Sequence, residues 1–242
     1  MYYKIIDNKK EKWIVLLHCI CSNMRLFDNS LDMLCRNYNV LMIDLPGHGK
    51  SKDCNDKINF ESTALYIANI IEELQINKVS IWGVSLGAVV AKHLLKIIPN
   101  KIEKIIFEGP AFAIANKLLM LLFILFNKIK YIIPKNMYIR CFIFTLLLGK
   151  GRKEIRRIMY EHLKYIDRKK ISQWLSALCN EMTKKDFNVL NNTDILKIYI
   201  IGENDYVFKN GVVKNITENK YNNIIIKESV GHLCHLEEII EV

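Results

Sequence analysis

Apolar residues follow two alternating patterns over the first 110 residues. Short continuous apolar runs are typical of strands buried on both faces of a sheet, whereas apolar residues three or four positions apart are typical of helices. The patterns predict strands at 13–18, 40–44, 79–82 and 102–107, helices at 27–36, 60–74 and 88–98, and a short edge strand at 2–6. This order of elements predicts a parallel sheet with right-handed crossovers.

The pattern changes after the last of these strands, where long helical segments begin. Residues 118–126 are apolar on all sides, residues 138–148 nearly so, and basic helices are predicted around 150–170. The apolar run between Lys117 and Lys128 is much shorter than the roughly 20 residues that span a bilayer. It therefore predicts a buried helix or a contact with a membrane surface.

The sheet pattern resumes after residue 190, with strands predicted at 196–201 and 224–226 and helices at 207–217 and 233–242. The pattern therefore divides the chain into a sheet-forming core, residues 1–110 and 191–242, and a helical insertion, residues 111–190. A length of 242 residues fits one domain with a large insertion.

The positive charge of the chain is concentrated in this insertion. The net charge of the whole chain is +10, and residues 111–190 hold 16 Lys/Arg against 5 Asp/Glu, a charge of +11. Such a segment suits a solvated surface or an anionic partner such as a membrane. No recognition module for nucleic acids accompanies the charge, so we expect no nucleic-acid partner.

The cysteines and the N-terminus indicate the compartment. Seven cysteines are scattered without paired spacing, and the N-terminus has no apolar segment long enough for a signal peptide. Both observations favour reduced thiols in a cytoplasmic protein. The sequence has no metal-ligand cluster, phosphate-binding Gly-rich loop or nicotinamide fingerprint, so we expect no metal and no cofactor.

One motif indicates chemistry. A predicted strand ends in Gly83-Val84-Ser85-Leu86-Gly87, and a predicted helix follows directly. Such a turn forces the serine into a strained conformation, and the two glycines leave room for the strand and the helix to approach. The serine oxygen then lies beside a helix N-terminus, which favours a developing negative charge. Taken alone, the motif also fits an ordinary strand-to-helix turn.

Two further residues suit a serine nucleophile, which needs a base to take its proton and an acid to orient the base. Asp205 and His232 follow predicted strands, as Ser85 does, and the carboxyl ends of parallel strands share one edge of the sheet. The chain order Ser, Asp, His is the one expected of this architecture. Glu108 competes with Asp205 as the acid, and His235 competes with His232 as the base.

Over essentially its whole length the chain resembles the α/β-hydrolase fold family. The resemblance rests on five pieces in order, which are the strand ending in His18, the turn Asp44-Leu45-Pro46-Gly47-His48-Gly49-Lys50-Ser51, the elbow at Ser85, Gly202-Glu203-Asn204-Asp205 and Gly231-His232. It implies a mostly parallel central sheet with helices on both faces. It also identifies residues 111–190 as a helical cap over the active site.

The resemblance implies roles for individual residues. Ser85 would be the nucleophile, His232 the general base and Asp205 the acid that orients it. The backbone N–H groups of Leu86 and Ile20 would be the oxyanion donors. Two other histidines, His18 and His48, are expected to shape loops, and His93 to be structural.

One departure from the family pattern concerns the second oxyanion donor. Relatives usually carry His-Gly where this chain has His18-Cys19. Glycine permits backbone angles there that cysteine adopts only at a cost of about 1 kcal/mol or more, so the departure bears on the geometry of this donor. Cys19 also competes as a nucleophile, although it lacks an elbow.

A serine at the elbow favours acyl transfer to water, because relatives that cleave carbon–halogen bonds or epoxides use aspartate there. We therefore expect hydrolysis of a carboxylic ester or thioester whose apolar acyl group fits the apolar cap. The alternatives are a cofactor-free C–C hydrolase, lyase or peroxidase-like enzyme on the same triad, or a non-catalytic ligand-binding protein of this fold. The expected partners are the small-molecule substrate and, through the basic cap, an anionic membrane, with a simply solvated basic face as the alternative.

Overall fold

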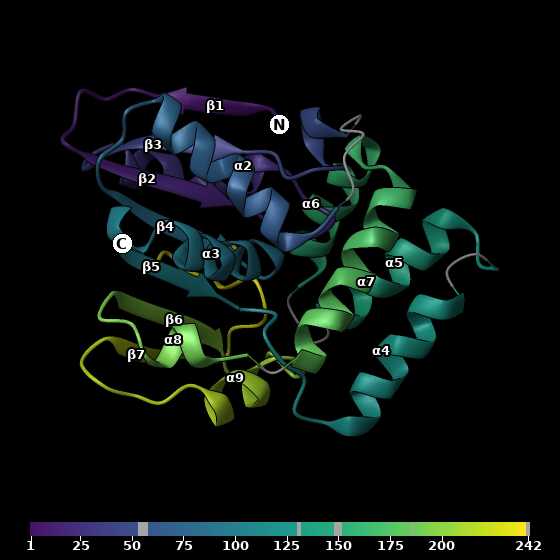
Figure 1. The fold of residues 1–242 in the computed structure, drawn as a ribbon. Helices are drawn as coiled ribbons and strands as arrows, with labels where there is room; N and C mark the ends of the chain where they lie inside the picture. The colour runs from purple at the N-terminus through teal and green to yellow at the C-terminus, as the bar shows by residue number, and fades with distance from the viewer. Residues whose placement is uncertain (53–57, 130–131, 148–151, 185, 241–242) are drawn as a thin grey trace.

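A seven-stranded sheet is the centre of the protein in its computed structural model, which describes residues 1–52, 58–129, 132–147, 152–184 and 186–240 (Figure 1). In spatial order the strands are β1 (Tyr3–Ile6), β3 (Tyr38–Ile43), β2 (Lys12–Leu17), β4 (Val79–Val84), β5 (Ile102–Glu108), β6 (Leu196–Gly202) and β7 (Asn222–Lys227). Strands β2 to β7 pair in parallel, and β1 pairs antiparallel with β3 at one edge. The prediction of a mostly parallel sheet is confirmed.

Helices of the core pack against the sheet, and the inserted segment lies at the carboxyl ends of the parallel strands. The two longest, α2 (Phe60–Glu73) and α3 (Leu86–Ile97), lie side by side over one face (Figure 1). The side chain of Asn59 caps α2 by accepting the N–H of Ser62. The shorter helices are η1 (Met24–Ser30), α1 (Leu31–Leu34), η2 (Gly49–Ser51), η3 (Pro99–Lys101), α9 (Lys209–Asn215) and η5 (Cys234–Leu236).

The segment between β5 and β6 is helical, as the sequence predicts. Its helices, called the inserted helices below, are α4 (Lys117–Ile129), α5 (Lys135–Leu146), α6 (Lys153–His162), η4 (Leu163–Tyr165), α7 (Arg168–Lys184) and α8 (Asn188–Asn191). In Figure 1, α4 to α7 stand beyond the carboxyl ends of the parallel strands. They therefore lie over the edge of the sheet where the candidate site residues meet.

The inserted helices attach to the turn after β3. The indole N–H of the fully buried Trp174 donates to the carbonyl of Pro46, at 2.8 Å. The backbone of Gly47 has φ +80°, and a Cβ there would lie 2.3 Å from the Cβ of Lys170. Glycine is thus required for both the turn and the close approach of α7. A bridge between His48 and Ile166 completes the contact.

Two predicted helices differ from the structure. The helix predicted at 27–36 is instead η1 followed by a single α turn, and Asn23 starts it by accepting the N–H of Arg25. The helix predicted at 233–242 is reduced to η5 over the described residues. The carboxylate of Glu237 accepts the N–H of Gly231 and forms an ion pair with Arg152, so this end of the chain is held by side-chain contacts. Positions 148, 150, 151, 241 and 242 of the predicted helices lie outside the described residues.

Helix α4 is not the buried helix that its composition suggests as one possibility. Leu118, Leu121, Leu122 and Leu125 all face outward, and about half or more of each residue's surface is exposed. Its 13 residues are also too few to cross a bilayer. None of the helices formed by the described residues has the length and hydropathy needed for a membrane span.

Candidate active site

Ser85 lies at the sharp turn between β4 and α3. Its φ of 53° and ψ of −103° are strained for a residue with a side chain. The two glycines make the turn possible. A Cβ at Gly83 would lie 2.6 Å from the carbonyl oxygen of Gly87, and one at Gly87 would lie 2.1 Å from that of Leu17. The steric role predicted for both glycines is confirmed.

Hydrogen bonds connect Ser85 to His232 and His232 to Asp205. Nε2 of His232 lies 2.9 Å from Oγ of Ser85, and its Nδ1 lies 2.7 Å from Oδ2 of Asp205. All three residues are buried. Because a carboxylate can only accept, Nδ1 of His232 carries the proton, and Nε2 is left to accept the hydroxyl proton of Ser85. The structure thus brings together the three residues that the sequence singled out.

Asp205 is held in its ionised form. Burial alone would raise the pKa of this carboxyl, but the charge and hydrogen bond of His232 lower it more. The N–H groups of Phe208 and Val207 also donate to its Oδ1, at 3.0 and 3.2 Å. The resulting pKa lies below the ordinary value for aspartate. An ionised Asp205 fixes the tautomer of His232 and stabilises a proton taken up by the ring.

Gly109 leaves the space that His232 occupies, a role that was not predicted from the sequence. Its φ is +46°, and a Cβ there would lie 2.4 Å from the carbonyl oxygen of His232 and 3.0 Å from its Nδ1. Any side chain at this position would therefore displace the imidazole. The sequence offered only a Gly-Pro pair that ends a strand, which has no link to a histidine 123 positions later.

The two competing candidates, Glu108 and His235, bind each other. Oε1 of Glu108 lies 2.7 Å from Nδ1 of His235 and also accepts the backbone N–H of His235. Oε2 accepts the indole N–H of Trp82, at 3.0 Å. Burial lowers the pKa of His235, but Glu108 and the carbonyl of Leu26 raise it by more than burial lowers it. The pKa of His235 therefore lies above the ordinary value for histidine. Since both ring nitrogens face acceptors, His235 is an imidazolium that neutralises a buried carboxylate.

Neither Glu108 nor His235 forms a side-chain hydrogen bond with Ser85 among the described contacts. The link from Glu108 to Ser85 is its backbone carbonyl, which accepts the N–H of Ser85 at 2.9 Å. The pair therefore braces the elbow and the loop that carries His232. Among the described contacts, the carboxylate that meets the ring of His232 belongs to Asp205.

The two proposed oxyanion donors belong to residues near Ser85, because Leu86 follows it in the chain and Ile20 lines the same cavity. Leu86 is the first residue of α3, so the helix does not satisfy its N–H. Ile20 lines the same cavity as Ser85. Among the described residues, left-handed backbone in this loop occurs at Cys21, with φ 63°, and not at Cys19. The expectation that cysteine in place of glycine strains position 19 is therefore wrong, because the turn takes its strain two residues later.

Two neutral histidines shape this loop and the turn after β3, as predicted. His18 donates from Nδ1 to the carbonyl of Cys19 and accepts the N–H of Leu45. His48 accepts the N–H of Cys21 at 3.1 Å and donates to a carbonyl of its own turn. Burial lowers the pKa of His18 to about 4 and that of His48 to about 3. Both rings are therefore uncharged at neutral pH.

Cys19 is not a competent nucleophile in this environment. The residue is buried, and burial together with the charge of Glu108 raises the pKa of its thiol to about 12. A thiol with such a pKa stays protonated at neutral pH, and the thiolate is the reactive form. The alternative of a cysteine nucleophile is therefore disfavoured.

The inserted helices close the space in front of Ser85. The cavity there measures about 10 Å³, the size of about one water molecule, and Ser85 is 2% exposed. Its walls include Phe142, Ile143 and Leu147 of the α5 region and Met159 of α6. The described residues therefore leave no room beside Ser85 for a group larger than a water molecule.

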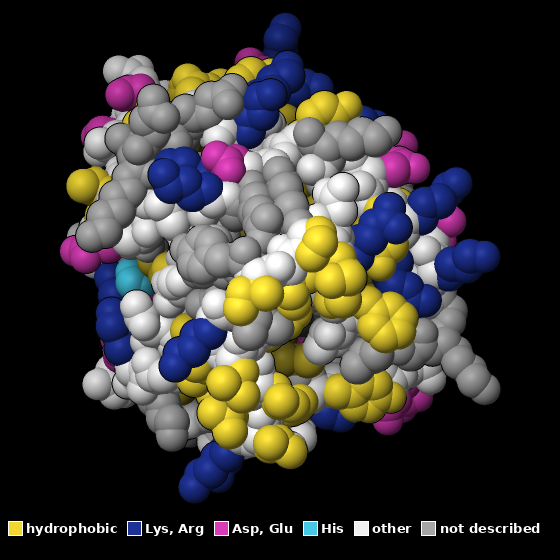
Figure 2. Space-filling view, turned by 90° about the vertical axis from the view of Figure 1, so that its right-hand side faces the viewer, with side chains coloured by type: hydrophobic (Ala, Val, Ile, Leu, Met, Phe, Trp, Pro, Cys, Tyr) yellow, Lys and Arg dark blue, Asp and Glu magenta, His cyan; other side chains and the backbone are white. Residues whose placement is uncertain are grey.

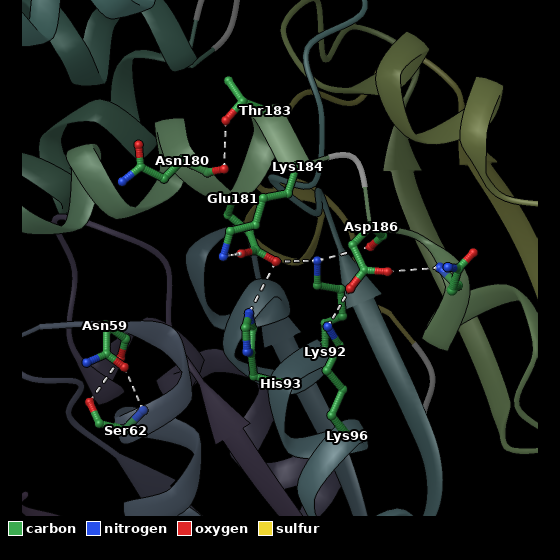
Figure 3. Close-up of polar contacts among 11 residues, drawn as sticks. Asn59, Ser62, Lys92, His93, Lys96, Asn180, Glu181, Thr183, Lys184 and Asp186 are labelled. Atoms are coloured by element: carbon green, nitrogen blue, oxygen red, sulfur yellow. Dashed lines mark hydrogen bonds and ion pairs between the residues drawn. The ribbon is translucent and has the colours of Figure 1, made fainter.

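A network of ion pairs links α7 to α3, the helix that follows Ser85 (Figure 3). Glu181 of α7 forms an ion pair with Lys92 of α3 and lies 3.2 Å from Nε2 of His93. Burial would raise the pKa of Glu181, but His93 and Lys92 together lower it to about 2. Lys96, one turn further along α3, pairs with Asp186. His93 is thus structural, as predicted.

A larger cavity lies beside this network. It measures about 520 Å³ and is lined by polar residues that include Asn59, His93, Gln173, Asn180 and Glu181. None of the three candidate catalytic side chains lines it. Among the described residues, no group of three or more His, Cys, Asp or Glu side chains is placed to hold a metal ion.

Comparisons with known proteins agree with this architecture. Residues 12–136 match a family model described as alpha/beta hydrolase fold. The pimeloyl-(acyl-carrier protein) methyl ester esterase of Nitrosomonas europaea is 27% identical over 94 residues, which are 38% of this chain. The match spans only 35% of that relative's length.

Solved structures match over nearly the whole chain. MenH from S. aureus is 19% identical with a TM-score of 0.78, and the match covers 98% of this chain and 93% of that one. An esterase from Exiguobacterium antarcticum is 17% identical with a TM-score of 0.82, covering 98% and 90%. A bromoperoxidase from Bacillus anthracis is 17% identical with a TM-score of 0.80, covering 97% and 89%. At these identities the likeness shows a shared fold.

Proposed function

The chain belongs to the α/β-hydrolase fold family, and on this premise we propose that it is a serine hydrolase that cleaves a carboxylic ester or thioester with an apolar acyl group. The observation that carries the proposal is the hydrogen-bonded series from Asp205 through His232 to Ser85 at a strained elbow. The esterase among the relatives supports hydrolysis as the general activity.

The geometry suits a two-step acyl transfer. Oγ of Ser85 attacks the acyl carbon while Nε2 of His232 takes the hydroxyl proton. The tetrahedral intermediate collapses, and His232 gives that proton to the departing alcohol or thiol. Water then attacks the acyl-enzyme, again passing a proton to His232, and the carboxylic acid leaves as Ser85 regains its hydrogen. Asp205 remains ionised throughout and stabilises the imidazolium.

The oxyanion of both intermediates needs preorganised donors. We propose the N–H groups of Leu86 and Ile20 for this role, because the first begins α3 and the second lies in the wall of the cavity at Ser85. The α3 N-terminus adds its dipole at the same place. The low dielectric of a closed cavity strengthens both interactions.

The lining of the cavity at Ser85 supports an apolar acyl group. Apart from Ser85 and His232, its walls are apolar or thiol side chains, including Phe142, Ile143 and Leu147. A charged acyl group would lose its hydration there without gaining a partner. A hydrocarbon chain would instead gain about 25 cal/mol for each Å² of apolar surface removed from water.

A fluorophosphonate probe tests the nucleophile. We expect the probe to label the wild-type protein and to leave the Ser85→Ala variant unlabelled. Ser22→Ala is a matched control, because its buried hydroxyl also lies 2.9 Å from a histidine nitrogen, that of His162. This variant should label as the wild type does. Absence of labelling in folded wild-type protein would contradict the proposal and favour a ligand-binding protein of this fold.

A series of p-nitrophenyl esters and matching thioesters tests the acyl group. We expect kcat/KM to rise with chain length from acetyl onward. Activity confined to acetyl esters would contradict an apolar acyl site. Probe labelling without hydrolysis of any member of the series would favour lyase, C–C hydrolase or peroxidase-like chemistry on the same residues.

We further propose a cytoplasmic location and no nucleic-acid partner. The location rests on seven cysteines without paired spacing, which suit a reducing compartment. A fluorescent fusion found outside the cytoplasm of the source cell would contradict it. The partner that we propose for the basic inserted helices is an anionic membrane.

A further inference from the structure

We propose that the outer face of α4 docks on an anionic lipid surface and that the groove between α4 and α5 receives the substrate's acyl chain from that surface. The docking itself is independent of the catalytic chemistry. The role of the groove rests on the proposed function.

The docking face is a stripe of leucines, called the leucine stripe below, formed by Leu118, Leu121, Leu122 and Leu125. These residues are spaced so that they share one side of a helix. Their exposed fractions are 63%, 51%, 50% and 46%. Figure 2 shows hydrophobic side chains gathered on the face formed by the inserted helices. An apolar patch of this kind on a protein surface marks an interaction site.

The charge around the stripe selects an anionic partner. Residues 111–153 contain eight Lys/Arg and no Asp or Glu. Lys117 and Lys128 are exposed at the two ends of the stripe, and Arg140 is exposed on α5. Lysine and arginine appear beside the hydrophobic side chains in Figure 2. Apolar residues flanked by cations are the pattern of a helix that lies in the interface of a membrane with anionic lipids.

The same charge disfavours a second copy of this chain as the occupant. Two copies joined through their leucine stripes would bring together two segments that are rich in lysine and arginine and contain no acidic residue. Like charges at an interface repel each other and oppose association. An anionic lipid surface offers both an apolar phase for the stripe and a counter-charge for its flanks.

An apolar groove leads from the stripe toward Ser85. It measures about 380 Å³, within the range of ligand-binding pockets, and lies between α4 and α5. Leu122 and Leu125 belong to both the stripe and the groove. Phe142 forms part of the wall of both the groove and the cavity at Ser85. A chain leaving the lipid phase would therefore meet mostly apolar side chains in the groove, which shares Phe142 with the wall of the cavity at Ser85.

Co-sedimentation with lipid vesicles tests the docking. The Ser85→Ala protein is mixed with two kinds of vesicle at about 0.1 M salt. One kind is phosphatidylcholine alone, and the other is phosphatidylcholine that contains roughly 30% of the anionic lipid phosphatidylglycerol. We expect binding to the anionic vesicles at least about tenfold stronger than to the neutral ones. Because this variant lacks the proposed nucleophile, binding succeeds or fails independently of the catalytic proposal.

Substitutions in the stripe and at its ends test the surface. Leu118→Ser with Leu121→Ser should weaken binding at least about tenfold, because two apolar side chains no longer enter the lipid. Leu65→Ser on α2 is the matched control, since Leu65 is also 51% exposed, and it should bind as the wild type does. Lys117→Glu with Lys128→Glu should weaken binding by about fivefold or more for each lysine, whereas Lys12→Glu at the start of β2 should not.

Three outcomes would overturn the docking proposal. The first is equal sedimentation with and without anionic vesicles. The second is equal weakening by the stripe variant and by Leu65→Ser. The third is a concentration-dependent dimer that the stripe substitutions abolish while vesicle binding is absent, which would assign the stripe to a second copy of the chain.

The groove is tested with soluble esters, away from any lipid. Leu119 lines the groove, whereas the exposed Leu65 on α2 lies outside both the groove and the leucine stripe. Leu119→Trp should lower the ratio of kcat/KM for a long-chain acyl ester to that for a butyryl ester by about tenfold. Leu65→Trp adds the same bulk away from the groove and should keep the ratio. An unchanged ratio in Leu119→Trp would overturn the role of the groove, while labelling of Ser85 would show that the catalytic proposal still stands.

Discussion

The pair formed by Glu108 and His235 allows a quantitative prediction for Glu108→Gln. The carboxylate is fully buried and accepts three hydrogen bonds, two from His235 and one from Trp82. Glutamine keeps the shape but replaces one acceptor oxygen with a donor NH₂ group. If this group faces Trp82, one N–H loses its acceptor; if it faces His235, two N–H groups lose theirs. In either orientation the buried imidazolium loses its counter-charge.

Each lost hydrogen bond to a charged group is worth about 1.5–3 kcal/mol, and breaking a buried ion pair costs about 3–5 kcal/mol in total. We therefore expect Glu108→Gln to lower the free energy of unfolding by about 3–5 kcal/mol at pH 6. Urea unfolding followed by circular dichroism measures this loss. Glu103→Gln, an exposed position on the same strand, should change the free energy by less than about 0.5 kcal/mol.

The pH dependence checks the same reasoning. The pKa of His235 is raised in the folded protein, so the stability that the pair contributes is fully present below the unfolded value of 6.5 and is lost as the pH rises through the folded value. The difference between wild type and Glu108→Gln should therefore be largest near pH 6 and shrink at higher pH. A loss below about 1 kcal/mol at pH 6, or a loss equal to that of Glu103→Gln, would refute the assignment of a charged pair.

Three further predictions concern the catalytic residues and their surroundings. Asp205→Asn should leave the protein folded and lower kcat by roughly 10³–10⁴ in ester hydrolysis, because His232 loses its tautomer and its counter-charge; wild-type activity would contradict this. Gly87→Ala should destabilise the fold by more than about 2 kcal/mol in urea unfolding, because the added Cβ would lie 2.1 Å from a backbone oxygen. The pKa values of His18 and His48 are lowered to about 4 and about 3, so their contribution to stability is present above pH 6.5 and is lost as the pH falls toward those values. The free energy of unfolding should then fall between pH 6.5 and 4 with a slope of up to about 1.4 kcal/mol per pH unit for each histidine, and a flat profile would show that the rings are not buried neutral.

The elements that the sequence predicts correctly depend on local pattern. Strands β2 to β5 are apolar runs whose residues are mostly buried, and burial on both faces of a sheet leaves a plain signal in the sequence. The elbow at Ser85 was equally easy to recognise in the sequence, because the two glycines that it requires lie within a five-residue motif, 83–87. Both features leave their signal within a short stretch of sequence, although the contact that requires Gly87 is with the carbonyl of Leu17 on β2.

The features that the sequence did not predict depend mainly on contacts between residues that are distant in the chain. Glu108 and His235 are 127 positions apart, and from their types alone each competes for a role in the triad. Nothing in the sequence shows that they satisfy each other. The predicted closing helix also involves a distant contact, because Glu237 forms an ion pair with Arg152, 85 positions earlier in the chain. Likewise, position 19 tolerates cysteine because the left-handed turn falls at Cys21.

The place of the insertion has a consequence for the newly made protein. Ser85 precedes the inserted helices, whereas Asp205 and His232 follow them, and the serine is 147 positions from the histidine that it meets. At about 5–20 residues per second, roughly 7 to 30 s of synthesis separate the two. A ribosome-bound chain that has made only the first four parallel strands therefore has the serine without its proposed base. On the proposed function, the hydroxyl would acquire nucleophilic character only after the helices that cover it have been synthesised, so no unguarded reactive form would arise during translation.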